Sequence, residues 1–163
     1  MGIKVFTPYE SDIRSMDMGG FHIQAFELTD ADGNPTHTNG DGTPCPCFGF
    51  LITHKECGKF LYVTDTQLVK YRFKNLNHIL LGVNYDVESI NTDCAKASHI
   101  LHGHMNLDTA REFIKANSNT DLHNVVLCHL STENAEPQRF QESISEVCEC
   151  PVSIARKGLK VEI

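Results

Sequence analysis

Alternating apolar and polar residues predict a half-buried strand over residues 20–28. Within it, Phe21, Ile23 and Ala25 alternate with polar neighbours. A turn is predicted at 54–58, between a strand at 48–53 and a strand at 59–64. Four later segments share short apolar runs bounded by turn-forming residues, the pattern of buried strands: 48–53, 59–64, 76–83 and 124–129.

Apolar residues at helical spacing predict two helices in the second half of the chain. One begins at Asn106 or Leu107 and ends near 117–119, and the other covers 135–147. A third helix is predicted over 89–101. The apolar positions that define the first two helices are Leu107, Ala110, Phe113, Ile114, Phe140, Ile144 and Val147.

The remaining segments lack these periods. Residues 1–18 are predicted to be an irregular lead-in that contains a strand start at 1–6, and residues 29–47 are predicted to be a long loop, because Asp, Asn, Gly and Pro dominate them. A closing hairpin is predicted from 152–155 and 159–163. The order of elements indicates one domain over 1–163, an α/β or α+β layer with one sheet and two or three helices.

Composition narrows the classes of function. The chain has 163 residues, of which 40% are hydrophobic, and its formal net charge is -7. This charge argues against a general nucleic-acid coat or a binder of anionic membranes. The seven cysteines have no regular spacing and do not suggest a disulfide framework. Without an apolar signal run or a membrane-length apolar stretch, the sequence predicts a cytoplasmic protein with no membrane association.

Three polar residues near the ends of predicted strands or the start of a helix form the strongest chemical signal. Asp65 and His129 each end a strand, and His104 precedes a helix. Ligands of open α/β sheets bind at such strand ends, and one carboxylate with two imidazoles suits Zn²⁺ or another first-row metal. Each residue also has a structural interpretation: Asp65 as a turn former, His104 as a helix cap and His129 as a core histidine.

Other candidate motifs are weaker. The series His99, His102 and His104 has no carboxylate or cysteine at a standard spacing to complete a metal site. The Cys45-Pro46-Cys47 and Cys148-Glu149-Cys150 pairs are narrower than the spacing of known thiolate zinc sites, which favours structural thiols. The sequence contains no phosphate-binding P-loop, dinucleotide-binding glycine motif or serine-hydrolase elbow.

Taken in chain order, six motifs from about residue 20 to 163 resemble the C-terminal half of a metallo-β-lactamase-fold hydrolase. The branch they resemble is that of ribonuclease Z and related phosphodiesterases, including small bacterial and phage-type members. The resemblance implies half of an αββα sandwich. The motifs are the 21–28 strand with the loop to Cys45-Pro-Cys-Phe-Gly-Phe-Leu-Ile, Leu61-Tyr-Val-Thr-Asp-Thr, Asn84-Tyr-Asp, Gly103-His-Met-Asn-Leu-Asp-Thr-Ala, Leu127-Cys-His-Leu-Ser and Ala155-Arg-Lys-Gly-Leu-Lys-Val.

The resemblance assigns a role to each matching residue. Asp65 matches the aspartate that bridges two metals, and His129 matches the last metal-binding histidine. His104 matches a histidine that acts as a proton donor near the scissile phosphate. His37, the histidine of the 29–47 loop, takes the place of the family's histidine after the 21–28 strand. The implied cofactor is Zn²⁺, Mn²⁺ or Fe²⁺, bound partially or not at all, and the implied reaction is phosphodiester hydrolysis.

The sequence departs from the family in lacking H-x-H-x-D-H, the motif that supplies most of the metal ligands. His37, Asp65 and His129 would leave an incomplete site, and one half of the sandwich would leave an apolar sheet face open to water. The expected cover is a second copy or a partner chain, with self-association favoured. The alternatives are a non-catalytic binding remnant, a split enzyme completed by a partner, or a truncated reading. The charge favours a small phosphodiester over long nucleic acid.

Overall fold

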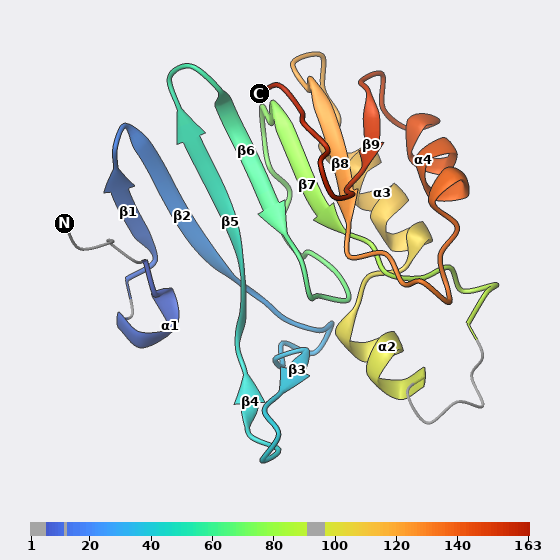
Figure 1. The fold of residues 1–163 in the computed structure, drawn as a ribbon. Helices are drawn as coiled ribbons and strands as arrows, with labels where there is room; N and C mark the ends of the chain where they lie inside the picture. Colours follow the sequence, from blue (N-terminus) through green and yellow to red (C-terminus); the bar gives the residue numbers. More distant parts are fainter. Residues whose placement is uncertain (1–5, 12, 91–96) are drawn as a thin grey trace.

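The computed structural model describes residues 6–11, 13–90 and 97–163. Its framework is one seven-stranded mixed sheet, with α3 and α4 packed on one face (Figure 1). A separate two-stranded sheet projects beyond one end of the large sheet, beside α2 (Figure 1). The strands are β1 (Ser15–Met18), β2 (Phe21–Leu28), β3 (His37–Thr38), β4 (Pro44–Cys45), β5 (Cys47–His54), β6 (Gly58–Val63), β7 (His78–Gly82), β8 (Asn124–Cys128) and β9 (Val152–Ile154). The helices are α1 (Pro8–Ser11), α2 (Ala97–Gly103), α3 (Leu107–Asn117) and α4 (Pro137–Ser145).

The strand order in the large sheet is β1-β2-β5-β6-β7-β8-β9. Strands β1, β2, β5 and β6 pair antiparallel in succession, whereas β6, β7, β8 and β9 run parallel. The carboxyl ends of parallel strands meet at one edge of a sheet. The segments that follow β6, β7 and β8 therefore lie together at that edge.

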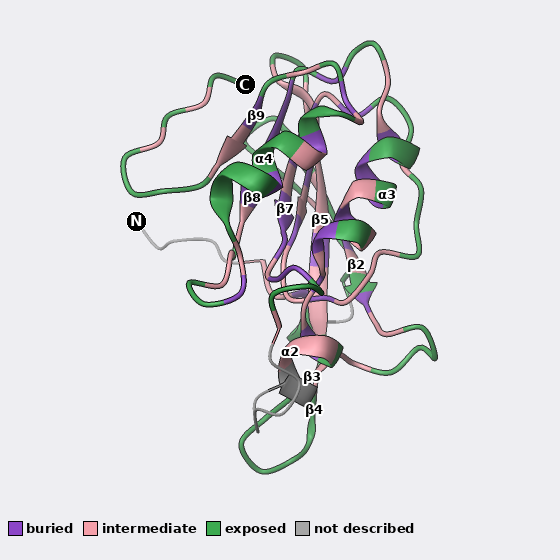
Figure 2. Ribbon diagram, turned by 90° about the vertical axis from the view of Figure 1, so that its right-hand side faces the viewer, coloured by how far each residue is buried: buried purple, intermediate pink, exposed green. Residues whose placement is uncertain are grey.

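The hydrophobic core lies between the sheet and the helices α3 and α4, where Figure 2 shows the buried residues concentrated. Alternate residues of the central strands point into it, as the period of a strand requires. Leu61 and Val63 of β6 are fully buried there, and so are Ile114 of α3 and Phe140 of α4. The α/β fold and mixed sheet expected from the sequence are confirmed.

Three strands and one helix match their sequence predictions closely. The alternating segment forms β2, the two apolar runs that follow form β5 and β6, and helical spacing gives α3. Asn106 is the N-cap of α3, and its side chain accepts a hydrogen bond from the Thr109 N–H. The predicted helix 89–101 corresponds to α2, which begins later, and residues 91–96 lie outside the described part of the chain.

Two predictions about irregular segments were wrong. Within the 1–18 lead-in, β1 pairs antiparallel with β2 at the sheet edge, and α1 precedes it. The strand start at 1–6 falls almost entirely outside the described residues. The 29–47 loop contains the β3–β4 pair and the first residue of β5. Asp30 and Asp41 order this loop, because their carboxylates accept hydrogen bonds from nearby backbone N–H groups.

The predicted closing hairpin is also wrong. β9 pairs parallel with β8, and residues 159–163 form no strand. Instead, Leu159 and Val161 line a hollow together with Phe60 and Leu80, on the sheet face opposite α3. Apolar contact with this face explains the alternating pattern of the tail without any strand pairing. None of the described helices has both the length and the apolar character that crossing a bilayer requires.

Candidate metal centre

Asp65 and His129 stand just beyond the carboxyl ends of parallel strands. Asp65 follows β6 and His129 follows β8, so one intervening strand, β7, separates them in the sheet. Both residues adopt left-handed backbone conformations, with φ of 57° and 61°. Such conformations are uncommon for residues other than glycine, and they concentrate at functional sites because the surrounding structure must hold them. Here they turn the side chains toward the same point.

His104 lies in the short segment between α2 and α3. The loop after β7 holds this segment in place through two backbone hydrogen bonds. The Asn84 N–H donates to the Met105 carbonyl at 2.8 Å, and the Leu107 N–H donates to the Tyr85 carbonyl at 2.9 Å. The His104 side chain is only 12% exposed. Its position is therefore fixed by the sheet edge rather than by a mobile loop.

His37 reaches the same place from the β3–β4 pair. The Thr36 hydroxyl donates to the Asp65 carbonyl at 3.1 Å and lies 3.1 Å from His37 Nδ1. Gly103, at the end of α2, allows the ring to approach, because a Cβ there would lie 3.2 Å from His37 Nε2. The loop that the sequence predicted to be irregular thus carries an imidazole held beside Asp65 by its neighbour Thr36.

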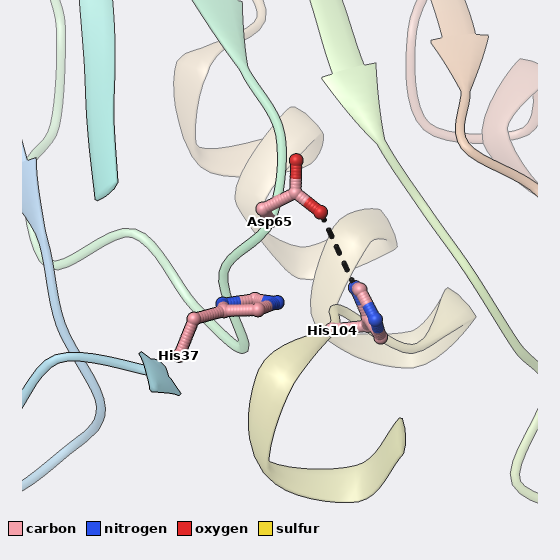
Figure 3. A group of neighbouring side chains, drawn as sticks. All are labelled: His37, Asp65 and His104. Carbon is pink, nitrogen blue, oxygen red and sulfur yellow. Dashed lines mark ion pairs between the residues drawn. The ribbon is translucent and has the colours of Figure 1, made fainter. Parts of the chain in front are cut away.

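The Asp65 carboxylate is the centre of this cluster. Its Oδ1 lies 3.7 Å from His104 Nδ1 and 3.3 Å from His129 Nε2. The His104 ring centre is 5.2 Å from that of His37 and 5.0 Å from that of His129. Figure 3 shows His37, Asp65 and His104 pointing toward one another from three separate elements. We call His37, Asp65, His104 and His129 together the His–Asp cluster.

The donor atoms of the cluster fit a divalent metal ion. One ligand atom from each of His37, Asp65 and His104 lies within 4.8 Å of the others. Two imidazoles and a carboxylate are ligands that Zn²⁺, Mn²⁺ and Fe²⁺ all accept. The Asp65 side chain is 37% exposed, so solvent and solutes can reach the carboxylate. In the absence of a metal, protonated imidazoles would form ion pairs with Asp65 instead.

The structure brings together all four residues that the sequence singled out, and their individual roles remain predictions. The other candidates from the sequence are not members of the cluster. His102 is exposed on α2, and the side chain of His99 is outside the described part. Cys148 donates to the Ile144 carbonyl at the end of α4, consistent with a structural thiol. Cys47, in contrast, contacts the cluster, with Sγ 3.7 Å from His37 Nδ1.

Sequence reasoning missed the supporting role of Asn84. Its side-chain amide donates to the His129 carbonyl at 2.8 Å and lies 3.3 Å from His129 Nδ1. These contacts hold the left-handed backbone at His129 and leave Nε2 facing Asp65. The signal was present in the sequence, since Asn84 follows the β7 strand at the same sheet edge as Asp65 and His129.

We expect Asn84→Ala to weaken metal binding by about 10- to 100-fold, the usual effect of losing a group that orients a ligand. The fold should persist, because the substitution removes no core side chain. Isothermal titration with Zn²⁺ measures the change in affinity, and circular dichroism checks the fold. An affinity equal to that of the unsubstituted protein would show that Asn84 does not orient His129.

Two thiols near the cluster are held in their protonated form. Burial raises the pKa of Cys128 to about 11, and the Asp65 carboxylate adds to this shift. Burial also raises the pKa of Cys47, with smaller contributions from Cys45 and Asp65. Since the thiolate is the reactive species, neither thiol is a strong nucleophile in the metal-free protein at neutral pH.

We expect Cys128 of the metal-free protein to resist iodoacetamide at neutral pH and to react as the pH approaches about 11. Because the pKa in the folded state is above the ordinary value of 9.0, the protonated thiol stabilises the fold below pH 9.0, and this contribution is lost as the pH rises toward about 11. Mass spectrometry of alkylated peptides measures the reaction. Labelling at neutral pH as fast as in urea would contradict the prediction.

Comparisons with known proteins agree with this architecture. No protein-family model matches the chain, and no curated protein matches it. Solved structures do match. The metallo-β-lactamase fold protein YhfI from Bacillus subtilis has a TM-score of 0.63 and 18% identity, over 94% of this chain and 53% of that one. An isothiocyanate hydrolase from Delia radicum gut bacteria has a TM-score of 0.62 and 17% identity, over 100% of this chain and 60% of that one.

A third match is Igni18, a metallo hydrolase from the archaeon Ignicoccus hospitalis. Its TM-score is 0.56 at 18% identity, over 99% of this chain and 59% of that one. At such identities the similarity shows the fold, which is that of metallo-β-lactamase fold proteins. The chain spans between half and two thirds of the length of these three structures.

Proposed function

We propose that this protein is a metal-dependent hydrolase and that its substrate is a small phosphodiester. The observation that carries the proposal is the convergence of His37, Asp65 and His104 within 4.8 Å, with His129 3.3 Å from Asp65. Two of the structural neighbours named above are hydrolases. The order of motifs along the chain supports the phosphodiester, and the net charge of -7 favours a small substrate over long nucleic acid.

In this proposal His37, Asp65 and His129 hold the divalent cation. When bound, the cation supplies Lewis acidity to the site. Water attacks the phosphorus and loses a proton to the solvent, the bond from phosphorus to the leaving oxygen breaks, and His104 delivers a proton to that oxygen. Its Nδ1 lies 3.7 Å from Asp65 Oδ1, so Asp65 can hold that nitrogen in its protonated form. Nε2, the other ring nitrogen of His104, is then the atom that donates the proton to the leaving oxygen.

The test compares metal content and hydrolysis in the same samples. Purified protein is loaded with Zn²⁺, Mn²⁺ or Fe²⁺ and offered bis(p-nitrophenyl) phosphate, a cyclic nucleotide, a carboxylic ester, a β-lactam and an isothiocyanate. We expect hydrolysis of the phosphodiesters, and His104→Gln should reduce kcat by about 10²- to 10⁴-fold while metal content is unchanged. His22→Gln, on the exposed part of β2, is the matched control.

Each outcome decides between interpretations. Loss of metal in His104→Gln would make His104 a ligand rather than the proton donor. Hydrolysis of the isothiocyanate or the ester alone would replace the phosphodiester as substrate. Bound metal without hydrolysis of any substrate would favour a binding module, an alternative suggested by the absence of H-x-H-x-D-H from these 163 residues. No bound metal at all would overturn the proposal.

We also propose that a second copy of this chain covers the sheet face opposite α3. Apolar side chains of β5 and β6, such as Phe50 and Tyr62, lie half-buried on this face. Toward the β1 edge, Met18 and Phe21 are each 39% exposed. Symmetric pairs are the commonest oligomers, and apolar faces of this kind mark interaction sites. Light scattering after size-exclusion chromatography should give the mass of a dimer, and a monomer at all concentrations would reject the proposal.

A further inference from the structure

Two side chains in the described part of the chain lie against Nδ1 of His37, the ring nitrogen nearer the backbone. The Thr36 hydroxyl oxygen is 3.1 Å from Nδ1, and the Cys47 sulfur is 3.7 Å from it. A hydroxyl or a thiol has one proton to donate and can also accept. The direction of these two contacts therefore determines which nitrogen of His37 carries the ring proton.

The Thr36 hydroxyl gives its proton to another group. It donates to the Asp65 backbone carbonyl at 3.1 Å, and a carbonyl oxygen can only accept a hydrogen bond. Because this single proton is used, the Thr36 oxygen can act toward His37 only as an acceptor. Nδ1 of His37 must then be the donor in their contact.

The Cys47 thiol leads to the same conclusion independently. Its S–H donates to the Cys45 backbone carbonyl, with Sγ 3.7 Å from the oxygen. The sulfur can therefore only accept from the His37 ring, and a thiolate at this position would also be an acceptor only. Both neighbours of Nδ1 require a proton on that nitrogen.

A proton on Nδ1 leaves the lone pair of the neutral imidazole on Nε2. Nε2 lies at the far end of the ring, and Figure 3 shows the His37 ring extending from β3 toward Asp65 and His104. A Cβ on Gly103, the residue before His104, would lie 3.2 Å from Nε2. The lone pair is thus at the end of the ring that points into the His–Asp cluster.

We propose that Thr36 and Cys47 are positioning residues that hold His37 in the Nδ1–H form, so that Nε2 is the nitrogen that binds the divalent ion. This inference rests on the proposed function, in which His37 is a metal ligand. A histidine whose other ring N–H is held by a fixed acceptor needs no proton transfer or ring flip before it binds a metal. Thr36 also links the loop that carries His37 to the backbone of Asp65, so one hydroxyl positions two ligands.

Nuclear magnetic resonance of the metal-free protein tests the position of the proton. At about pH 8.5, where an ordinary imidazole is neutral, a long-range proton–nitrogen spectrum distinguishes protonated from unprotonated ring nitrogens. We expect Nδ1–H for His37, with its signals identified by their loss in His37→Gln. Thr36→Val keeps the shape of the side chain without the hydroxyl and should shift His37 toward Nε2–H, whereas Thr36→Ser should retain Nδ1–H. Thr38→Val, the same change at an exposed position of β3, is the matched control.

Zn²⁺ affinity, measured by isothermal titration, is the second readout. We expect Thr36→Val to weaken Zn²⁺ binding by about 10- to 100-fold, and Thr36→Ser and Thr38→Val to bind as the unsubstituted protein does. Cys47→Ala should cause a smaller loss, because its sulfur is farther from Nδ1 than the Thr36 oxygen is. Weaker binding by Thr36→Val with an unchanged position of the ring proton would reveal a merely structural role and overturn the inference.

Neither measurement depends on hydrolysis, so the two proposals can be separated. Hydrolysis by a protein whose His37 carries its proton on Nε2 would overturn this inference alone. Bound Zn²⁺ and the Nδ1–H form in a protein that hydrolyses no substrate would support this inference and overturn only the proposed function. Absence of Zn²⁺ binding would overturn both.

Discussion

Asp65→Asn is expected to abolish metal binding at the His–Asp cluster and to reduce metal-dependent hydrolysis by at least about 10²-fold. The carboxylate is the group that His104 and His129 both face, at 3.7 Å and 3.3 Å from its Oδ1. Asparagine keeps the shape of the side chain and tolerates the left-handed backbone at this position, but it removes the negative charge. The loss is therefore chemical and not a consequence of misfolding.

Elemental analysis of the purified variant measures this loss directly. Asp108→Asn, an exposed change of the same type on α3, is the control and should retain its metal. Thermal unfolding should show similar stability for the two variants in the presence of a chelator. If Asp65→Asn retained the metal content of the control, Asp65 would not be a ligand, and the proposed centre would lose its only carboxylate among the four residues.

The second large effect is expected in the core, where Phe140→Ala should lower the free energy of unfolding by about 3–5 kcal/mol. Phe140 is fully buried between α4 and the sheet, among Leu127, Ile114 and Ile144. Truncation to alanine removes the buried ring and leaves a cavity that the rigid sheet cannot close. Urea denaturation followed by circular dichroism measures the change.

Gln138→Ala on the exposed side of α4 provides the comparison. Its side chain hydrogen-bonds Glu142 one turn later, and loss of such a pair costs about 0.2–0.5 kcal/mol. A Phe140→Ala effect as small as this would mean that α4 contributes little to the core. Since α4 follows the His129 segment, such a result would also weaken the view that the core fixes the cluster.

The position of the His–Asp cluster in the sheet explains how a chain with so few catalytic motifs can still assemble a candidate metal site. Asp65, Asn84 and His129 come from three adjacent parallel strands, so the sheet itself sets their spacing. Only His37 and His104 depend on connecting segments, and each is fixed by hydrogen bonds to the loops after β6 or β7. A site built on the edge of a rigid sheet needs little reorganisation to bind an ion.

Local periodicity was sufficient to predict β2, β5, β6 and α3, because each buries one face and its sequence repeats with the period of its own geometry. Asp65 and His129 were found for a related reason, as polar residues directly after apolar strands. The sequence also limited the chemistry, since its histidines and aspartates suit a divalent metal and it lacks nucleotide-binding motifs.

Only the tertiary structure determined which segments, far apart along the chain, contact one another. Strand β1 is recognised by its pairing with β2 and not by its own polarity, and the tail at 159–163 packs against the sheet instead of pairing. The approach of His37 to Asp65 depends on a hydrogen bond from Thr36 to a residue 29 positions away. The rings of His78 and His123, whose centres lie 5.6 Å apart, come together because β7 pairs parallel with β8. Such contacts arise from backbone pairing and from packing across the sheet. They join residues far apart along the chain and therefore leave no periodic pattern in the local sequence.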